Sequence, residues 1–141
     1  MKKITGFFLL FSLLFILSCQ ENKVHNTVLP PEQLEGEWNL IYILHGFSSY
    51  VKEYPRAIIV WNFNTANQTV TIQNNSSTTT DRYIFENGTY PYVLTPNTDG
   101  SLSCLQTLTV QDVNLGCCTI TNGELSFSAI YLDGDYLKLV R

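Results

Sequence analysis

From residue 35 onward the chain alternates hydrophobic and polar residues in short runs. The runs are rich in Val, Ile, Thr and aromatic residues, and turn-forming residues separate them, which predicts β-strands. No helical spacing of hydrophobic residues is found in this region. The eight expected strands are 38–45, 57–63, 69–73, 89–95, 101–110, 117–121, 124–131 and 135–141. Residues 82–86 are a candidate ninth strand, because the following Asn87-Gly88 is a hairpin signal.

The alternation within each strand predicts which side chains face the interior, since successive side chains point to opposite faces of a sheet. In the first strand the most consistent inward set is Trp38, Leu40, Tyr42 and Leu44. Further inward sets are Val70 with Ile72, Leu125 with Phe127 and Ala129, and Leu137 with Leu139 and Arg141.

The lengths of the connections differ between the two ends of the predicted strands. If the strands run up and down, three short connections (64–68, 96–100 and 122–123) lie at one end. The other end carries the longer connections 46–56, 74–88 and 111–116, together with the tight turn 132–134. One narrow end and one end with long loops are typical of a cup-shaped, eight-stranded antiparallel up-and-down barrel. A β-sandwich is the alternative.

The first and last expected strands meet at the narrow end if the barrel closes. Trp38 opens the first strand and Arg141 ends the last, so the guanidinium should lie over the indole. Such a contact contributes about 0.5–2 kcal/mol. Gly36 would let the backbone turn in tightly beneath the ring. We therefore expect Gly36, Trp38 and Arg141 to form the structural floor of the barrel.

The N-terminus has the pattern of a secretory signal. Lys2 and Lys3 precede an apolar run at 4–17, which is too short for a membrane-spanning helix. Ser18 and Cys19 follow two aliphatic residues and resemble a bacterial lipobox. This resemblance implies a signal peptide at 1–18, lipidation of Cys19, a polar tether at 19–33 and a domain at 34–141. Gln20 in place of aspartate implies sorting to the outer membrane of the bacterial envelope.

The charge of the chain limits its partners. The formal net charge is −4, and removal of residues 1–18 leaves six basic residues against twelve acidic ones. A mildly acidic chain without a basic cluster argues against nucleic acid and against electrostatic binding to anionic lipid. Membrane attachment is therefore expected to depend on the lipid anchor.

Three cysteines would remain in the mature chain beside the lipidated one. Cys117 and Cys118 are neighbours and are too close to bridge each other, so either could pair with Cys104. In the alternation of the strands, Cys104 shares a face with Leu102 and Leu108, and Cys118 shares a face with Ile120. This favours a Cys104–Cys118 disulfide. No metal site is expected, because there is no Cys-x-x-Cys and the two histidines lie far from these cysteines.

The residues "GEW" at 36–38 open the first expected strand with a Gly-x-Trp motif, formed by Gly36 and Trp38, and Arg141 closes the last strand. In these features the chain resembles the lipocalins, and with the lipobox it resembles the lipocalin-like lipoproteins of Gram-negative bacteria. The resemblance implies a calycin-type barrel. The chain departs from the lipocalin pattern near the turn between the sixth and seventh expected strands, where "TITNGE" stands in place of a Thr-Asp-Tyr motif.

Two functions fit this barrel. The first is a lipid-anchored envelope protein that binds a small, mainly apolar molecule in the barrel cavity, beneath a lid at 46–56 that carries Phe47, Tyr50 and Tyr54. The second is a filled barrel that acts as a protein-interaction module (envelope assembly, adhesion or inhibition) through its open-end loops, because an eight-stranded interior is only just wide enough for side chains or one small ligand. The expected ligand-binding residues are Tyr42, Leu44, Ile59, Trp61, Tyr90, Tyr92, Leu108, Phe127 and Ala129.

No catalytic or cofactor-binding motif is recognised, so an enzyme is not expected. Two pairs of carboxylates flank glycines: Glu35 with Glu37, and Asp133 with Asp135. Each pair lies beside a turn or a strand start, where solvated acids are common. His45 near the wide end has no nucleophile placed beside it by any motif.

Overall fold

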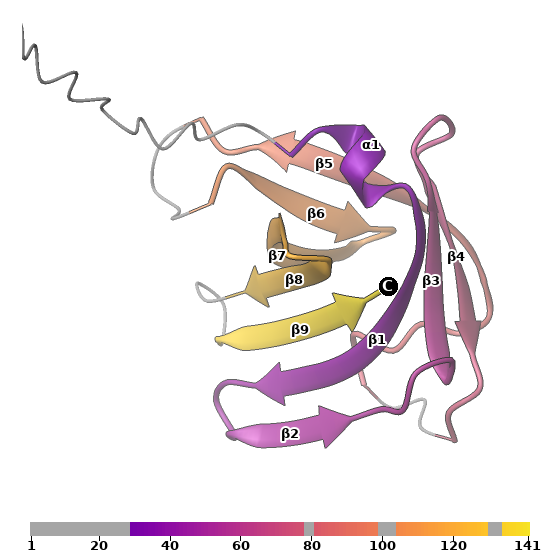
Figure 1. Ribbon diagram of the computed structural model, residues 1–141. Coiled ribbons are helices and arrows are strands. Elements are labelled where there is room, and N and C mark those ends of the chain that lie inside the picture. The colour runs from indigo at the N-terminus through magenta and orange to yellow at the C-terminus, as the bar shows by residue number, and fades with distance from the viewer. Residues whose placement is uncertain (1–28, 78–80, 99–103, 130–133) are drawn as a thin grey trace, which may run out of the picture.

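The computed structural model describes residues 29–77, 81–98, 104–129 and 134–141 (Figure 1). One turn of helix, α1 (Pro31–Leu34), precedes the strands. These are β1 (Gly36–His45), β2 (Tyr50–Glu53), β3 (Ile59–Asn64), β4 (Thr69–Asn74), β5 (Gly88–Pro96), β6 (Gln106–Val110), β7 (Val113–Thr121), β8 (Glu124–Ala129) and β9 (Asp135–Val140). In the described residues no helix has the length and apolar character needed to cross a membrane. The predicted signal peptide, Cys19 and most of the predicted tether lie outside these residues.

The strands form one antiparallel sheet that closes on itself. The order is β2-β1-β3-β4-β5-β6-β7-β8-β9, and β1 also pairs with β9. Eight strands therefore make a closed up-and-down barrel, and β2 is an additional strand alongside β1 (Figure 1). This confirms the predicted barrel over the sandwich, and the arrangement is consistent with a calycin-type fold.

A bulge in β1 changes which of its side chains face inward. The register against β9 shifts between Leu40 and Tyr42. One extra residue in a strand reverses the faces of all residues beyond it. Ile43 is accordingly buried, whereas Tyr42 and Leu44 are only partly buried. The prediction that Tyr42 and Leu44 line the interior is therefore wrong.

A second bulge lies between β6 and β7. The register shifts between Leu108 and Thr109, opposite Gly116. Gly116 has φ +84°, and a Cβ there would lie 2.2 Å from the carbonyl oxygen of Ser128, so a side chain has no room. Only a tight turn at Gln111 and Asp112 separates β6 from β7. The predicted long connection at 111–116 is wrong.

The wide-end segments also differ from expectation. Residues 46–56 contain β2, which pairs with the second half of β1. Residues 82–86 form no ninth strand, because β4 and β5 pair directly with each other and leave no place between them. These residues nevertheless contribute three buried side chains, those of Tyr83, Ile84 and Phe85.

The narrow end is closed by Trp38 and Arg141. Trp38 is fully buried, and its Nε1 donates a hydrogen bond to the Leu34 carbonyl oxygen at 2.8 Å. The Arg141 guanidinium carbon lies 4.4 Å from the centroid of the Trp38 ring. Its Nη2 also donates to the carbonyl oxygens of Gln33 and Glu35. The C-terminal residue thus ties the start of the barrel to α1.

The disulfide joins Cys104 to Cys117, with a Cα–Cα distance of 5.6 Å. The predicted Cys104–Cys118 bridge is wrong: Cys104 lies before the start of β6, and the register of β6 with β7 sets Cys117 opposite Thr107. Cys118 is a free thiol within the hydrophobic core. Burial raises the pKa of this thiol to about 12.

Candidate functional site

The barrel interior is occupied by an aromatic cluster. Trp61 and Phe127 are fully buried with ring centroids 6.2 Å apart. Phe63 lies 6.1 Å from Trp61 and packs edge-on against Tyr92 at 5.3 Å. Offset and edge-to-face pairs at these distances are the favourable arrangements for aromatic rings. These side chains make the barrel centre a packed hydrophobic core.

The segment 81–86 covers the wide end of this core. Tyr83 is fully buried, and Phe85 is only 8% exposed. The Phe85 ring meets Trp61 edge-on, with centroids 5.5 Å apart. Tyr90 packs on the other side of Phe85 and donates its hydroxyl to the Glu86 carbonyl oxygen. Side chains of this segment therefore pack onto the aromatic cluster at the wide end of the barrel.

The nine expected ligand-binding residues separate into two groups in the structure. Tyr42 and Leu44 lie beyond the β1 bulge, and Tyr90 is partly buried against residues 85 and 86. The six that are buried in the interior are Ile59, Trp61, Tyr92, Leu108, Phe127 and Ala129.

A polar network fastens the covering segment to the barrel wall, and we call it the rim cluster. Its members are His45, Lys52, Asp81, Arg82, Tyr83 and Asp135. They come from β1, β2, residues 81–83 and the start of β9. Segments far apart in sequence are thereby joined at one end of the molecule.

Asp135 is the first centre of the rim cluster and is only 4% exposed. Its Oδ1 accepts the Gly46 amide at 2.9 Å, and its Oδ2 accepts the Tyr83 hydroxyl at 2.8 Å. Arg82 Nη2 forms an ion pair with the same Oδ2. Burial opposes ionisation of Asp135, but the bonds from Tyr83, Gly46 and Arg82 outweigh it and lower the pKa of this carboxyl. Burial and the bond to Asp135 raise the pKa of Tyr83 to about 12.

Asp81 is the second centre, with a side chain 3% exposed. Its Oδ2 lies 2.8 Å from His45 Nε2 and 3.5 Å from Lys52 Nζ. Its Oδ1 accepts the Tyr83 amide at 3.1 Å. The imidazole of His45 stacks with the rings of Tyr50 and Tyr83, each with its centroid 6.2 Å away. His45 is thus held both by ring contacts and by a carboxylate.

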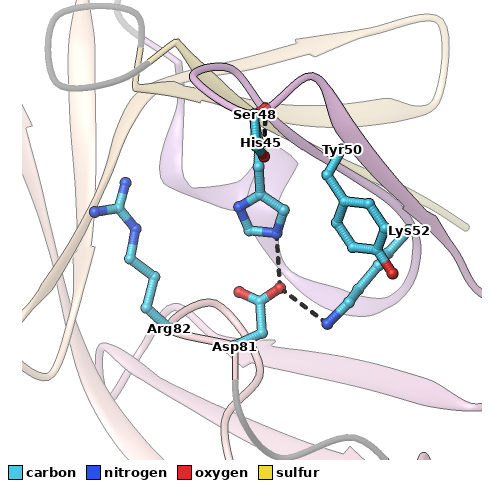
Figure 2. A pocket seen from close by; sticks show the side chains of 6 residues that line it. All are labelled: His45, Ser48, Tyr50, Lys52, Asp81 and Arg82. Atoms are coloured by element: carbon cyan, nitrogen blue, oxygen red, sulfur yellow. Dashed lines mark hydrogen bonds and ion pairs between the residues drawn. The ribbon is translucent and has the colours of Figure 1, made fainter.

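An open depression of about 750 Å³ lies over the rim cluster. Its lining residues are His45, Ser48, Tyr50, Lys52, Asp81 and Arg82 (Figure 2). Figure 2 shows Lys52 and Arg82 on opposite sides of the His45–Asp81 pair. A smaller hollow of about 300 Å³ adjoins it at Phe47 and Asp135.

The geometry of His45 suits a structural and binding role better than proton transfer. Its Nε2 is hydrogen-bonded to Asp81, and its Nδ1 faces Asp135 at 3.9 Å. Ser48, the nearby hydroxyl of the depression, contacts the backbone carbonyl of His45 and not the ring. A nucleophilic serine needs a hydrogen bond to an imidazole nitrogen, so these residues do not form that arrangement. Within the described residues, no group of three or more His, Cys, Asp or Glu side chains could hold a metal ion.

Sequence reasoning missed the rim cluster. Asp135 was expected to be solvated beside a turn, yet it occupies the inward phase of β9 that Leu137 and Leu139 share. A carboxylate in an inward phase was the available signal of a buried polar site. The role of Asp81 had no such signal, because it lies at the end of a polar loop and reaches His45 only through the fold.

Comparisons of this chain with protein-family models, curated proteins and solved structures found no match.

Proposed function

We propose that this protein is a lipid-anchored module of the bacterial envelope whose barrel is filled and whose open-end loops bind a protein partner. The observation that carries the proposal is the packing of Trp61 against Phe85 and Phe127 beneath a covered mouth. Fully buried rings that pack on one another at native density support a filled barrel, since an apolar guest among them would have to displace core side chains. Of the two functions that the sequence suggested, this packing favours the interaction module.

The orientation of the molecule supports this assignment. The predicted tether enters at α1, next to the narrow end where Arg141 contacts Gln33. The rim cluster lies at the opposite end of β1, as Figure 1 shows from the positions of α1 and β2. A lipid at Cys19 would therefore attach the narrow end toward the membrane and direct the rim away from it. In this orientation the rim at the wide end is free to contact another envelope protein.

Two further observations fit an envelope location. The Cys104–Cys117 disulfide is of the kind that persists in oxidising compartments such as the periplasm. The Arg141–Trp38 contact is the feature on which the resemblance to lipocalin-like lipoproteins depends. We propose an outer-membrane lipoprotein of that kind, without enzymatic activity or cofactor.

The test is the binding of Nile red, a neutral environment-sensitive dye. The protein used is residues 19–141 with Cys19→Ser, which carries no lipid and therefore needs no detergent. We expect no stoichiometric binding to this protein. Phe85→Ala is the positive control, because removal of a buried ring leaves a cavity that apolar molecules can enter. One-to-one binding to the parent protein that Ala129→Trp abolishes would instead establish the apolar-ligand function.

A further inference from the structure

The strand β2 gives this closed barrel an edge. Barrel closure pairs each of the eight barrel strands on both sides, but β2 pairs only with β1 among the described residues. An edge strand presents unpaired backbone groups that can hydrogen-bond to another strand. In Figure 1, β2 lies at the outer side of β1, away from β9.

The outward backbone groups of β2 can be assigned. The Tyr54 amide donates to the Ile41 carbonyl oxygen at 2.9 Å, so this residue faces β1. Backbone bonding alternates along an antiparallel pair, which turns the residues at 50 and 52 toward β1 as well. The N–H and C=O groups of Val51 and Glu53 therefore point away from β1.

The side chains around this edge are unusually apolar for the molecule's surface. Among the described residues, four large hydrophobic side chains are exposed, and three of them lie in the β1–β2 hairpin. Phe47 at its tip is 95% exposed, Tyr50 is 55% exposed and Val51 is 41% exposed. Clustered exposure of this kind marks interaction surfaces.

The rim cluster supplies charge beside the same edge. Its carboxylates form the inner layer, since the side chains of Asp81 and Asp135 are 3% and 5% exposed. Its basic groups are the outer layer: Lys52 is 22% exposed and Arg82 is 47% exposed. Tyr50 and Lys52 are two residues apart in β2, so they share the face that overlooks the depression.

From these features we infer that β2 binds an extended, acidic segment of a partner protein, which adds to the sheet as an antiparallel strand. This inference deepens the proposed function and rests on it. The partner's backbone would pair with Val51 and Glu53, in the manner of β-augmentation. An acidic side chain opposite Lys52 would lie over the depression and add to the ion pairs that Lys52 and Arg82 already form with Asp81 and Asp135.

A second copy of this chain fits the edge less well. The antiparallel register that pairs Val51 with Glu53 of another copy sets Lys52 directly opposite Lys52. Like charges directly opposite in a sheet are destabilising, whereas opposite charges are favourable. In this register the lysine therefore favours an acidic partner strand over a second copy of the chain.

The probe is a capped nonapeptide in which glutamate alternates with valine, with a lysine-for-glutamate peptide as its matched control. Both are added to residues 19–141 carrying Cys19→Ser. We expect only the glutamate peptide to bind, with slower hydrogen exchange at the Val51 and Glu53 amides. Equal binding of both peptides, or unchanged exchange at these two amides, would overturn the inference. Protection of the amides without peptide, in a concentration-dependent dimer, would also overturn it and identify a second copy as the occupant.

Two variants test the separate contributions of backbone and charge. Val51→Pro removes one outward N–H at an edge position where proline is tolerated, and it should weaken peptide binding about tenfold or more. Val51→Thr keeps the N–H and should bind as the parent does. Lys52→Gln should weaken binding about two- to fivefold and reduce its salt dependence. Unchanged binding by Val51→Pro would contradict strand addition, and the amide exchange of the parent decides the question if this variant does not fold.

Failure here is distinguishable from failure of the proposed function. Stoichiometric Nile red binding to the parent protein would overturn the filled barrel. A protein that takes up no dye and also shows no peptide protection at Val51 and Glu53 would retain the filled barrel and lose only the strand-addition site.

Discussion

At the residue scale, Trp38 is held by two contacts from separate parts of the chain. Its indole N–H donates a hydrogen bond to the Leu34 carbonyl oxygen, just before β1, and its ring contacts the Arg141 guanidinium that follows β9. The carbonyl contacts of Arg141 extend the same connection to Gln33 and Glu35. One buried ring at the narrow end thus links the segment that begins the barrel to the residue that follows its last strand.

We predict that Trp38→Ala lowers the free energy of unfolding by about 3–5 kcal/mol, the range for truncation of a large buried side chain. Arg141→Ala should cost less, because this side chain is exposed. Since the two side chains touch, their effects should not add in the double variant. Urea unfolding of the four proteins measures the coupling, and strictly additive effects would contradict a direct contribution of the contact.

The lowered pKa of Asp135 predicts that the free energy of unfolding falls at acid pH. Its folded pKa is lowered, so its ionised form stabilises the fold above the unfolded value of about 3.9, and this stabilisation is lost as pH falls through the folded pKa. Asp135→Asn should therefore destabilise the protein by about 1–3 kcal/mol at pH 7. The difference from the parent should shrink below about pH 4. Urea unfolding at pH 7 and pH 3 tests this, with the exposed Asp112→Asn as control; a difference that stays constant between these pH values would contradict it.

At the scale of elements, alternation predicted the strands and their closure but not their interruptions. The pattern located eight barrel strands because each carries one buried face, as in β8, where Leu125, Phe127 and Ala129 are buried. The sequence pattern does not show the bulge in β1, because Ile41, Tyr42, Ile43 and Leu44 are all hydrophobic and could each face either side of the sheet. The packing of residues 83–85 at the wide end could not be predicted from the sequence either, since it depends on contacts with Trp61 that exist only in the folded barrel.

The pairing of β6 with β7 leads to a prediction about the cysteines. Peptide mapping without reduction should yield a Cys104–Cys117 linked pair and one free thiol at Cys118. Cys117→Ala should destabilise the protein by about 3 kcal/mol, the value expected for a loop of roughly this length. Cys118→Ala keeps the bridge and is the control. Since burial raises the pKa of the Cys118 thiol to about 12, iodoacetamide should label it only after unfolding. A linked peptide that contains Cys104 and Cys118 would refute this pairing.

At the scale of the whole molecule, the two ends of the barrel differ in structure. The narrow end joins α1, the first strand and the last residue into a closed floor. The wide end combines the covering segment, the rim cluster and the edge of β2, which together form the surface that we propose for partner binding. Because the predicted tether joins at the narrow end, the lipid anchor that we propose at residue 19 would leave the wide end accessible.

The lipid anchor is the prediction on which this orientation depends. Radiolabelled palmitate should mark the full-length protein in bacterial cells, and Cys19→Ala should abolish the label while the barrel still folds. The protein is acidic, so without acyl chains it should not remain on an anionic membrane by charge alone. The variant should therefore appear in the soluble fraction after cell breakage, whereas the parent should sediment with outer membranes. Equal labelling of both proteins would show that Cys19 is not the acceptor and would remove the reason for directing the wide end away from the bilayer.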